Sequence, residues 1–343
     1  MKILLEAHHP AHIHFWKYPV RELQAKGHKV LMIGRDRDVM RRLLEVYDWI
    51  PAEIPKRRWC DNRFPLVEML ERQWAVARAI RRFKPDVVAS LMGSYTQSAK
   101  LFGVRNVVFT DSEFQHFNHR IAHPFADEIY TPECFYKELG PKQRRYAGIH
   151  ELSFLHPEVF TADSSVLERY SSLAEAPYIV IRLSAWNTFH DRNHRGIGNR
   201  IYNFVEQFKD DYQIVLSAEE GKLPPGLESY AQIFQSEDFH QILAHARFVL
   251  SEGASTASEA ACLGVPCVYI NSTERRGYLD MLGERYDLVD SFADAAEGMS
   301  WAARKVSEAS EGSEQTKEAH RKLIRAHFPS TAGLVADILL KHS

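Results

Sequence analysis

Short apolar runs alternate with stretches of helical periodicity along the first half of the chain. The apolar runs predict strands and the periodic stretches predict helices. The expected strands are 1–6, 30–34, 87–91, 106–110 and 128–131, and the expected helices are 15–26, 38–46 and 66–83. An opening strand, helix and strand of this kind predicts a doubly wound parallel sheet.

The second half repeats the same alternation after a mixed, Ser- and Glu-containing stretch at 148–172. Strands are expected at 178–183, 213–217, 248–250 and 267–270, and helices at 199–209, 239–245 and about 331–341. A chain of 343 residues is long for one core and comfortable for two domains. The sequence therefore predicts an α/β protein with domains at 1–155 and 170–325, and a C-terminal helix, 326–343, packing back towards the first.

Residues 248–271 carry the clearest local pattern. An apolar strand passes into the small-residue turn Ser251-Glu252-Gly253-Ala254-Ser255-Thr256, and a helix follows with Ser255 or Thr256 as its expected cap. Gly264 suits the end of that helix. Unpaired N–H groups at such a helix start favour phosphate, and Glu259 is placed to reach a ribose. An ordinary crossover without a ligand fits the spacing equally well.

This turn, with Glu-Ala and Gly-x-Pro after it, resembles the nucleotide-sugar site of glycosyltransferases with the GT-B fold. MurG and UDP-N-acetylglucosamine 2-epimerase are similar here. The overall match is to an uncharacterised prokaryotic GT-B-like family. The resemblance implies two Rossmann-like domains facing across a cleft. It also implies phosphate binding by Gly253, Ala254, Ser255 and Thr256, and ribose binding by Glu259.

Composition and cysteine use indicate an ordinary globular protein. Hydrophobic residues make up 45% and charged residues 26% of the chain, and no apolar run approaches the ~18 residues of a spanning helix. The four cysteines contain no CxxC pair, which favours reduced thiols over disulfides or zinc. The N-terminus lacks the features of a signal peptide, so a cytoplasmic location is expected.

Charge is unevenly distributed, with a basic first half and an acidic second half. The stretch 56–84 combines many Lys and Arg residues with Trp59, Phe64, Trp74 and Phe83. Such a mixture suits peripheral contact with an anionic membrane or binding of a phosphorylated acceptor, and equally a solvated helix face. The pI of 6.8 and the lack of a known motif argue against nucleic acid.

Histidines crowd the first strand–helix junction: His8, His9, His12 and His14. They have no standard metal-ligand spacing, so no metal is expected. The segment Pro10-Ala11-His12-Ile13 resembles the opening of GT-B enzymes, in which a histidine stands fifteen residues before a glycine, here Gly27. That resemblance makes His12 the candidate base for an acceptor hydroxyl. A histidine satisfied by backbone groups is the alternative.

Four further residues complete the expected site. Asp111, after the strand 106–110, is the candidate partner that orients His12, with Glu113 second and an N-cap role as the alternative. Arg182 is placed to bind a diphosphate or to serve as an ion-pair partner. Thr273-Glu274-Arg275 resembles a turn of the epimerase, which implies sugar contacts for Glu274 and Arg275.

Three functions remain open. The first is an inverting glycosyltransferase that moves a sugar from a nucleotide sugar, such as a UDP-sugar, to a glycan or lipid-linked acceptor, with no cofactor. The second is an epimerase, although Ser94, His116 and Phe117 stand where the epimerase has acidic groups. The third is a nucleotide-sugar-binding protein without turnover.

Overall fold

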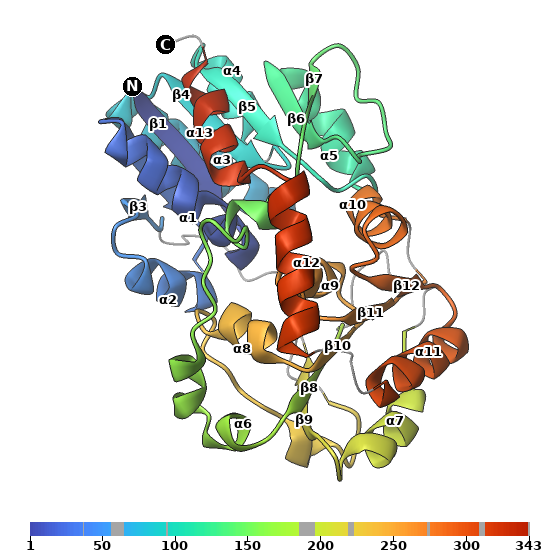
Figure 1. The fold of residues 1–343 in the computed structure, drawn as a ribbon. Coiled ribbons are helices and arrows are strands. Elements are labelled where there is room, and N and C mark those ends of the chain that lie inside the picture. The colour runs from blue at the N-terminus through green and yellow to red at the C-terminus, as the bar shows by residue number, and fades with distance from the viewer. Residues whose placement is uncertain are drawn as a thin grey trace. The chain divides into compact units, whose positions relative to one another are not determined.

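The computed structural model describes residues 1–36, 38–55, 65–93, 95–184, 196–218, 223–272, 275–308 and 313–341. The chain divides into two compact units. Unit 1 comprises Met1–Phe154 and Phe328–Ser343, and unit 2 comprises Leu155–His327. Each unit is built around one parallel sheet (Figure 1).

Unit 1 contains a seven-stranded sheet in the order β3-β2-β1-β4-β5-β6-β7, in which every paired neighbour is parallel. Its strands are β1 (Lys2–Ala7), β2 (Lys29–Gly34), β3 (Ala52–Glu53), β4 (Val87–Leu91), β5 (Arg105–Phe109), β6 (Glu128–Pro132) and β7 (Gln143–Tyr146). Its helices are α1 (Pro10–Ala25), α2 (Asp38–Val46), α3 (Pro65–Phe83), α4 (Thr96–Leu101), α5 (His116–Ile121) and α13 (Thr331–Leu340).

Helices cover both faces of this sheet, which explains why its strands are almost continuously apolar. Ile3 and Leu5 of β1 pack into one core with α1 and α13, and Leu4, between them, packs into a second core with α3 and α4. Figure 1 shows α13 lying beside α1, although the two are far apart in sequence. Arg105 donates to the carbonyls of Ile338 and Leu339 and so holds the end of α13.

Unit 2 contains a five-stranded parallel sheet in the order β12-β11-β10-β8-β9. Its strands are β8 (Tyr178–Leu183), β9 (Gln213–Ala218), β10 (Phe248–Ser251), β11 (Cys267–Ile270) and β12 (Asp290–Phe292). Its helices are α6 (Ser171–Glu175), α7 (Arg200–Phe208), α8 (Phe239–His245), α9 (Ala254–Cys262), α10 (Gly277–Asp280), α11 (Ala295–Ser307) and α12 (Glu314–His327).

The predicted fold class of two parallel α/β domains is confirmed, with differences at particular elements. Unit 2 begins at Leu155 rather than near 170, and Arg169 in this stretch pairs with Asp238 of the same unit at 2.6 Å. The sequence interpretation missed β3, α4, β7 and β12, which are short, and also the longer helices α11 and α12. It also started α1 too late, since Pro10 already forms the first turn.

By composition, Glu314–Leu340 is long and apolar enough to cross a membrane. This stretch is two helices, α12 and α13, separated by residues 328–330. Val335, Ala336 and Leu339 of α13 are fully buried in the core of unit 1. Packing in the core of unit 1 therefore accounts for the apolar character of α13.

Candidate functional site

The first cluster of titratable side chains lies where β1 ends and α1 begins. β1 is the point at which the strand order of unit 1 reverses, with β2 on one side and β4 on the other. Ligands of open α/β sheets bind at the carboxyl ends of the strands beside such a reversal. Glu6, near the end of β1, is paired in register with Ser90 of β4, so the cluster occupies that position.

Glu6, His8 and His12 form this cluster, and their ligand-type atoms all lie within 4.8 Å of one another. His8 Nδ1 is 2.7 Å from Glu6 Oε1, and the rings of His8 and His12 meet edge to face with centroids 4.1 Å apart. The main chain of Glu6 also accepts a hydrogen bond from Trp16 Nε1, which fixes α1 against the end of β1. The sequence placed His12 and His14 in a loop, but both lie in α1.

Burial controls the protonation of this cluster. Glu6 is 1% exposed, and burial raises its pKa to about 7 against the opposing influence of His12 and Arg72. Burial, with the nearby His8, lowers the pKa of His12 well below its usual value. His12 is therefore neutral at pH 7 and able to accept a proton. Its Nδ1 is buried without a hydrogen-bond partner among the described residues.

Two imidazoles and a carboxylate are also donors that hold a divalent ion such as zinc. The charge around Glu6 argues against that role, because Arg72 Nη2 lies 3.7 Å from Glu6 Oε1. A guanidinium at this distance would repel a cation bound to the same carboxylate. The charge around Glu6 therefore favours an acid–base group over a cation site.

The expected pairing of Asp111 with His12 is not what the structure shows. Asp111 Oδ2 lies 3.1 Å from Nδ1 of His150, which belongs to the 3₁₀ turn η2 (His150–Ser153). Burial acts to raise the pKa of Asp111, but the His150 ion pair outweighs it and lowers the value to about 2. Burial acts to lower the pKa of His150, and Asp111 raises it overall. The carboxyl group that shares a cluster with His12 is Glu6.

The second candidate, Glu113, follows β5 and is 1% exposed. Its backbone carbonyl accepts a hydrogen bond from Lys137 Nζ at 2.6 Å.

In unit 2 the strand, turn and helix expected at residues 248–271 are confirmed. β10 ends at Ser251, α9 begins at Ala254 with Gly253 as its N-cap, and Gly264 follows the helix with a φ of +81°. The expected cap at Ser255 or Thr256 is wrong, because both residues lie within the first turn of α9. Gly253 has no side chain to cap the helix. The backbone N–H groups of the first turn of α9 are therefore available to an anion.

Glu259 and Arg182 lie close to this turn in the fold. Glu259 projects from α9 and its Oε1 is 3.2 Å from Nε2 of His240, which holds the carboxyl group at a fixed place. Arg182 lies in β8, is paired in register with Ser251 of β10, and donates to Oγ of Ser217 at 2.6 Å. The strand order of unit 2 reverses between β8 and β10, so these residues occupy the equivalent binding position of the second sheet.

Glu252, which the sequence interpretation did not select, organises the same edge. Its side chain is 3% exposed, and its two oxygens accept from the backbone N–H groups of Ser184 and Ile197 at 2.9 and 2.7 Å. It thereby fixes both described ends of the segment that follows β8. A cavity of about 810 Å³ adjoins it, lined in part by Ser184, Asn199 and Ser272.

Of the last two expected sugar contacts, only one is among the described residues. Glu274, with Thr273, lies outside the described residues. Arg275 is described, and its guanidinium contacts Asp280 at 2.8 Å and Glu284 at 3.3 Å. Its side chain is 69% exposed.

Glu6 and His150, like Glu252, are functional candidates that sequence reasoning missed. A signal for Glu6 existed, because a charged residue stands near the end of a strand whose other buried positions are apolar. No local signal pointed to His150, because it lies in a short 3₁₀ turn that only the fold brings to Asp111.

Comparison with known structures shows the same architecture. UDP-GlcNAc 2-epimerase from Neisseria meningitidis, bound to UDP-GlcNAc, matches with a TM-score of 0.69 at 12% identity, and the match covers 100% of each chain. The glycosyltransferase SsfS6 of Streptomyces sp. SF2575 matches with a TM-score of 0.57 at 14% identity, covering 98% of this chain and 99% of its own. At these identities the likeness establishes the GT-B fold.

Sequence comparison identifies relatives over most of the chain. An uncharacterized protein of Methanocaldococcus jannaschii, MJ0665, is 24% identical over 268 residues, which cover 75% of this chain and 78% of the relative. The model of one family, described as a protein of unknown function (DUF354), matches residues 1–320. The chain therefore belongs to the DUF354 family.

Proposed function

We propose that the protein is an inverting glycosyltransferase that uses a nucleotide sugar, such as a UDP-sugar, and a glycan or lipid-linked acceptor. The observation that carries the proposal is the buried, neutral His12 beside Glu6, at the strand reversal of a GT-B fold. A neutral imidazole can take the proton of an acceptor hydroxyl as the oxygen attacks the sugar.

The step balances with the groups that the fold provides. The acceptor oxygen forms a bond to the anomeric carbon, and its proton passes to His12. The bond from that carbon to the donor phosphate breaks, and the nucleoside diphosphate leaves with the electron pair. In its ionised form Glu6 favours the protonated imidazole through its negative charge, and His8 positions the Glu6 carboxyl group at 2.7 Å.

Unit 2 supplies groups suited to the departing diphosphate. The first-turn N–H groups of α9, at Ala254, Ser255 and Thr256, favour an anion at the helix start, and Gly253 allows its close approach. Arg182 adds a guanidinium that can bind the leaving oxygens. Glu274 is proposed to contact the sugar, whereas the guanidinium of Arg275 is already engaged by Asp280 and Glu284 and is left out of the proposed site.

Glu259 is proposed to bind the ribose. One of its oxygens is engaged by His240, and the other has no protein partner among the described residues, so it can accept from a ribose hydroxyl. The related epimerase fold motivates a second candidate, epimerisation of the same donor. The expected loss of its acidic groups, at His116 and Phe117, favours transfer.

The first test is calorimetric titration with UDP, GDP, CMP and dTDP. One nucleotide is expected to bind selectively, and Glu259→Gln is expected to weaken it by about 10- to 100-fold, since a hydrogen bond to a charged group contributes roughly 1.5–3 kcal/mol. Glu206→Gln, a change of the same type on α7 where Glu206 pairs with Lys209, serves as the control.

Failure of all four nucleotides to bind would reject the donor assignment. If a nucleotide binds, incubation with the matching nucleotide sugars separates the remaining functions. Epimer formation without an acceptor would favour the second candidate, and binding without any turnover would identify a binding protein.

A further inference from the structure

A pocket of about 490 Å³ lies in unit 1 between α3 and the ends of β2 and β3. We call it the arginine pocket, because four arginines line it: Arg35, Arg72, Arg78 and Arg82. Three of them project from α3 and one follows β2. The rest of the wall includes Trp74, Tyr95, Glu53 and Glu71.

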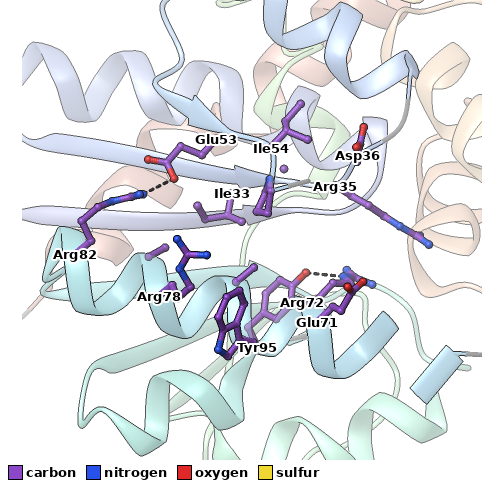
Figure 2. Close-up of a pocket in the computed structure, with 15 residues that line it drawn as sticks. Ile33, Arg35, Asp36, Glu53, Ile54, Glu71, Arg72, Arg78, Arg82 and Tyr95 are labelled. Atoms are coloured by element: carbon purple, nitrogen blue, oxygen red, sulfur yellow. Dashed lines mark hydrogen bonds and ion pairs between the residues drawn. The ribbon is translucent and has the colours of Figure 1, made fainter. Parts of the chain in front are cut away.

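Ion pairs neutralise charge at two places on the pocket wall. Arg82 pairs with Glu53, and Asp36 pairs with Arg41 at 2.7 Å. Figure 2 shows Arg78 rising from α3 towards Ile33, between the Arg82–Glu53 pair and Arg72 with Tyr95. Arg78 has no carboxylate partner among the described residues, and its guanidinium stacks over Trp74 at 4.7 Å from the ring centroid. The lining holds four arginines against three acidic residues, Asp36, Glu53 and Glu71, so its net formal charge is positive.

Arg72 joins this pocket to the candidate base. Its Nε donates to the hydroxyl of Tyr95 at 2.6 Å, and its Nη2 lies 3.7 Å from Glu6 Oε1. Arg35 also acts on Glu6, since its charge is among those that oppose the raised pKa of Glu6. Arg72 is therefore shared between the wall of the arginine pocket and the cluster that contains His12.

Trp74 gives the pocket an apolar rim. Trp74 is 52% exposed, and Arg78 lies over its ring. An arginine stacked on an aromatic ring is held in a fixed plane, ready to bind two oxygens of one anion. The combination suits an anionic group attached to an organic body.

We propose that the arginine pocket binds a phosphate group of the acceptor and so places the acceptor hydroxyl at His12. This inference deepens the proposed function and rests on it, because the proposed function identifies the bound molecule as an acceptor. Guanidinium groups bind phosphate oxygens in pairs, and the pocket is lined by Arg35, which follows β2, and by Arg78 of α3. The phosphate can belong to a soluble sugar phosphate or to a lipid-linked sugar.

The test measures binding of inorganic pyrophosphate in the presence of saturating UDP, so that the α9 turn of unit 2 is already occupied. Quenching of Trp74 fluorescence and calorimetry report the same event. Arg78→Gln is expected to weaken binding at least tenfold. Arg81→Gln, three residues further along α3, exposed and outside the pocket, is expected to change it less than twofold.

Two outcomes would overturn the inference. One is an absence of saturable pyrophosphate binding to the wild-type protein, and the other is an equal loss in the Arg78 and Arg81 variants. If UDP does not bind, the same two variants are compared without it. Pyrophosphate binding that depends on Arg78 would then support the pocket while the donor assignment fails.

Two further probes distinguish the source of the phosphate. Glucose 1-phosphate represents a soluble acceptor, and phosphatidylcholine vesicles with phosphatidic acid represent a lipid-borne one, compared with vesicles of phosphatidylcholine alone. The probe whose binding depends on Arg78 identifies the source. If neither depends on Arg78, the acceptor assignment is overturned.

Discussion

Two strand–helix junctions carry the candidate chemistry, and they are built in different ways. The junction of β1 and α1 in unit 1 gathers buried side chains that titrate, namely Glu6, His8 and His12. The junction of β10 and α9 in unit 2 has small residues and presents main-chain N–H groups. Both stand at a reversal of strand order, and the proposed function assigns proton transfer to this position in one sheet and anion binding to it in the other.

Among the variants considered, His12→Ala should have the largest effect, and this effect should fall on turnover and not on nucleotide binding. Removing a general base lowers turnover by about 10²- to 10⁴-fold. UDP binding should stay within twofold, because the nucleotide groups belong to unit 2. Steady-state transfer kinetics and calorimetry on the same preparation provide the measurement.

The control for that variant is His28→Ala. His28 lies just before β2, at the amino-terminal ends of the strands, whereas the His12 cluster lies at their carboxyl-terminal ends. Equal losses in both variants, or loss of UDP binding with His12→Ala, would show that the two junctions are not separate in function.

Glu6→Gln should change how stability depends on pH. The folded-state pKa of Glu6, about 7, exceeds the ordinary 4.5, so the folded protein holds the proton more tightly. Stability from this group is therefore full below pH 4.5 and is lost as the pH rises through 7, by about 3 kcal/mol in all. Relative to wild type, the variant should gain stability by that amount between pH 4.5 and 8, measured by urea unfolding.

The pH dependence of the difference is the decisive quantity, because the variant also alters the hydrogen bond to His8 at every pH. A difference that stays constant from pH 4.5 to 8 would mean that Glu6 is ionised throughout. In that case its carboxylate would be a fixed charge beside His12.

The sequence predicts the two junctions unequally. The apolar runs at β1, β8, β10 and β11 and the helix stop at Gly264 depend on local patterns, and the structure confirms them. The partnership of Glu6 with His12 depends on where α1 begins, and a late start for that helix concealed it. The bond from Asp111 to His150 depends on β5 and η2 coming together in the fold, which periodicity does not encode.

Asp111→Asn tests whether Asp111 serves His150 or His12. The ion pair lowers the pKa of Asp111 from 3.8 to about 2, which corresponds to about 2 kcal/mol of stability. This contribution is present above pH 3.8 and is lost as the pH falls through 2. At pH 5 the variant should therefore be less stable by about that amount in urea unfolding.

His150→Gln should produce a similar loss, and the double variant should lose little more than either single variant. Turnover of Asp111→Asn should remain within tenfold of wild type. A fall as large as that of His12→Ala would restore Asp111 to the catalytic group.

Arg275→Ala should have the smallest effect on nucleotide-sugar affinity. This variant tests which residues near the unit 2 junction contact the donor. Arg275 is exposed and already engaged by Asp280 and Glu284, so a sugar would have to displace existing contacts to gain a new one. Exposed pairs of this kind contribute little. We expect the affinity for the intact nucleotide sugar to change less than twofold, while Arg182→Gln weakens it more, because Arg182 is fixed in β8 by Ser217. A larger effect at Arg275 would extend the donor site beyond the end of β11, towards the start of α10.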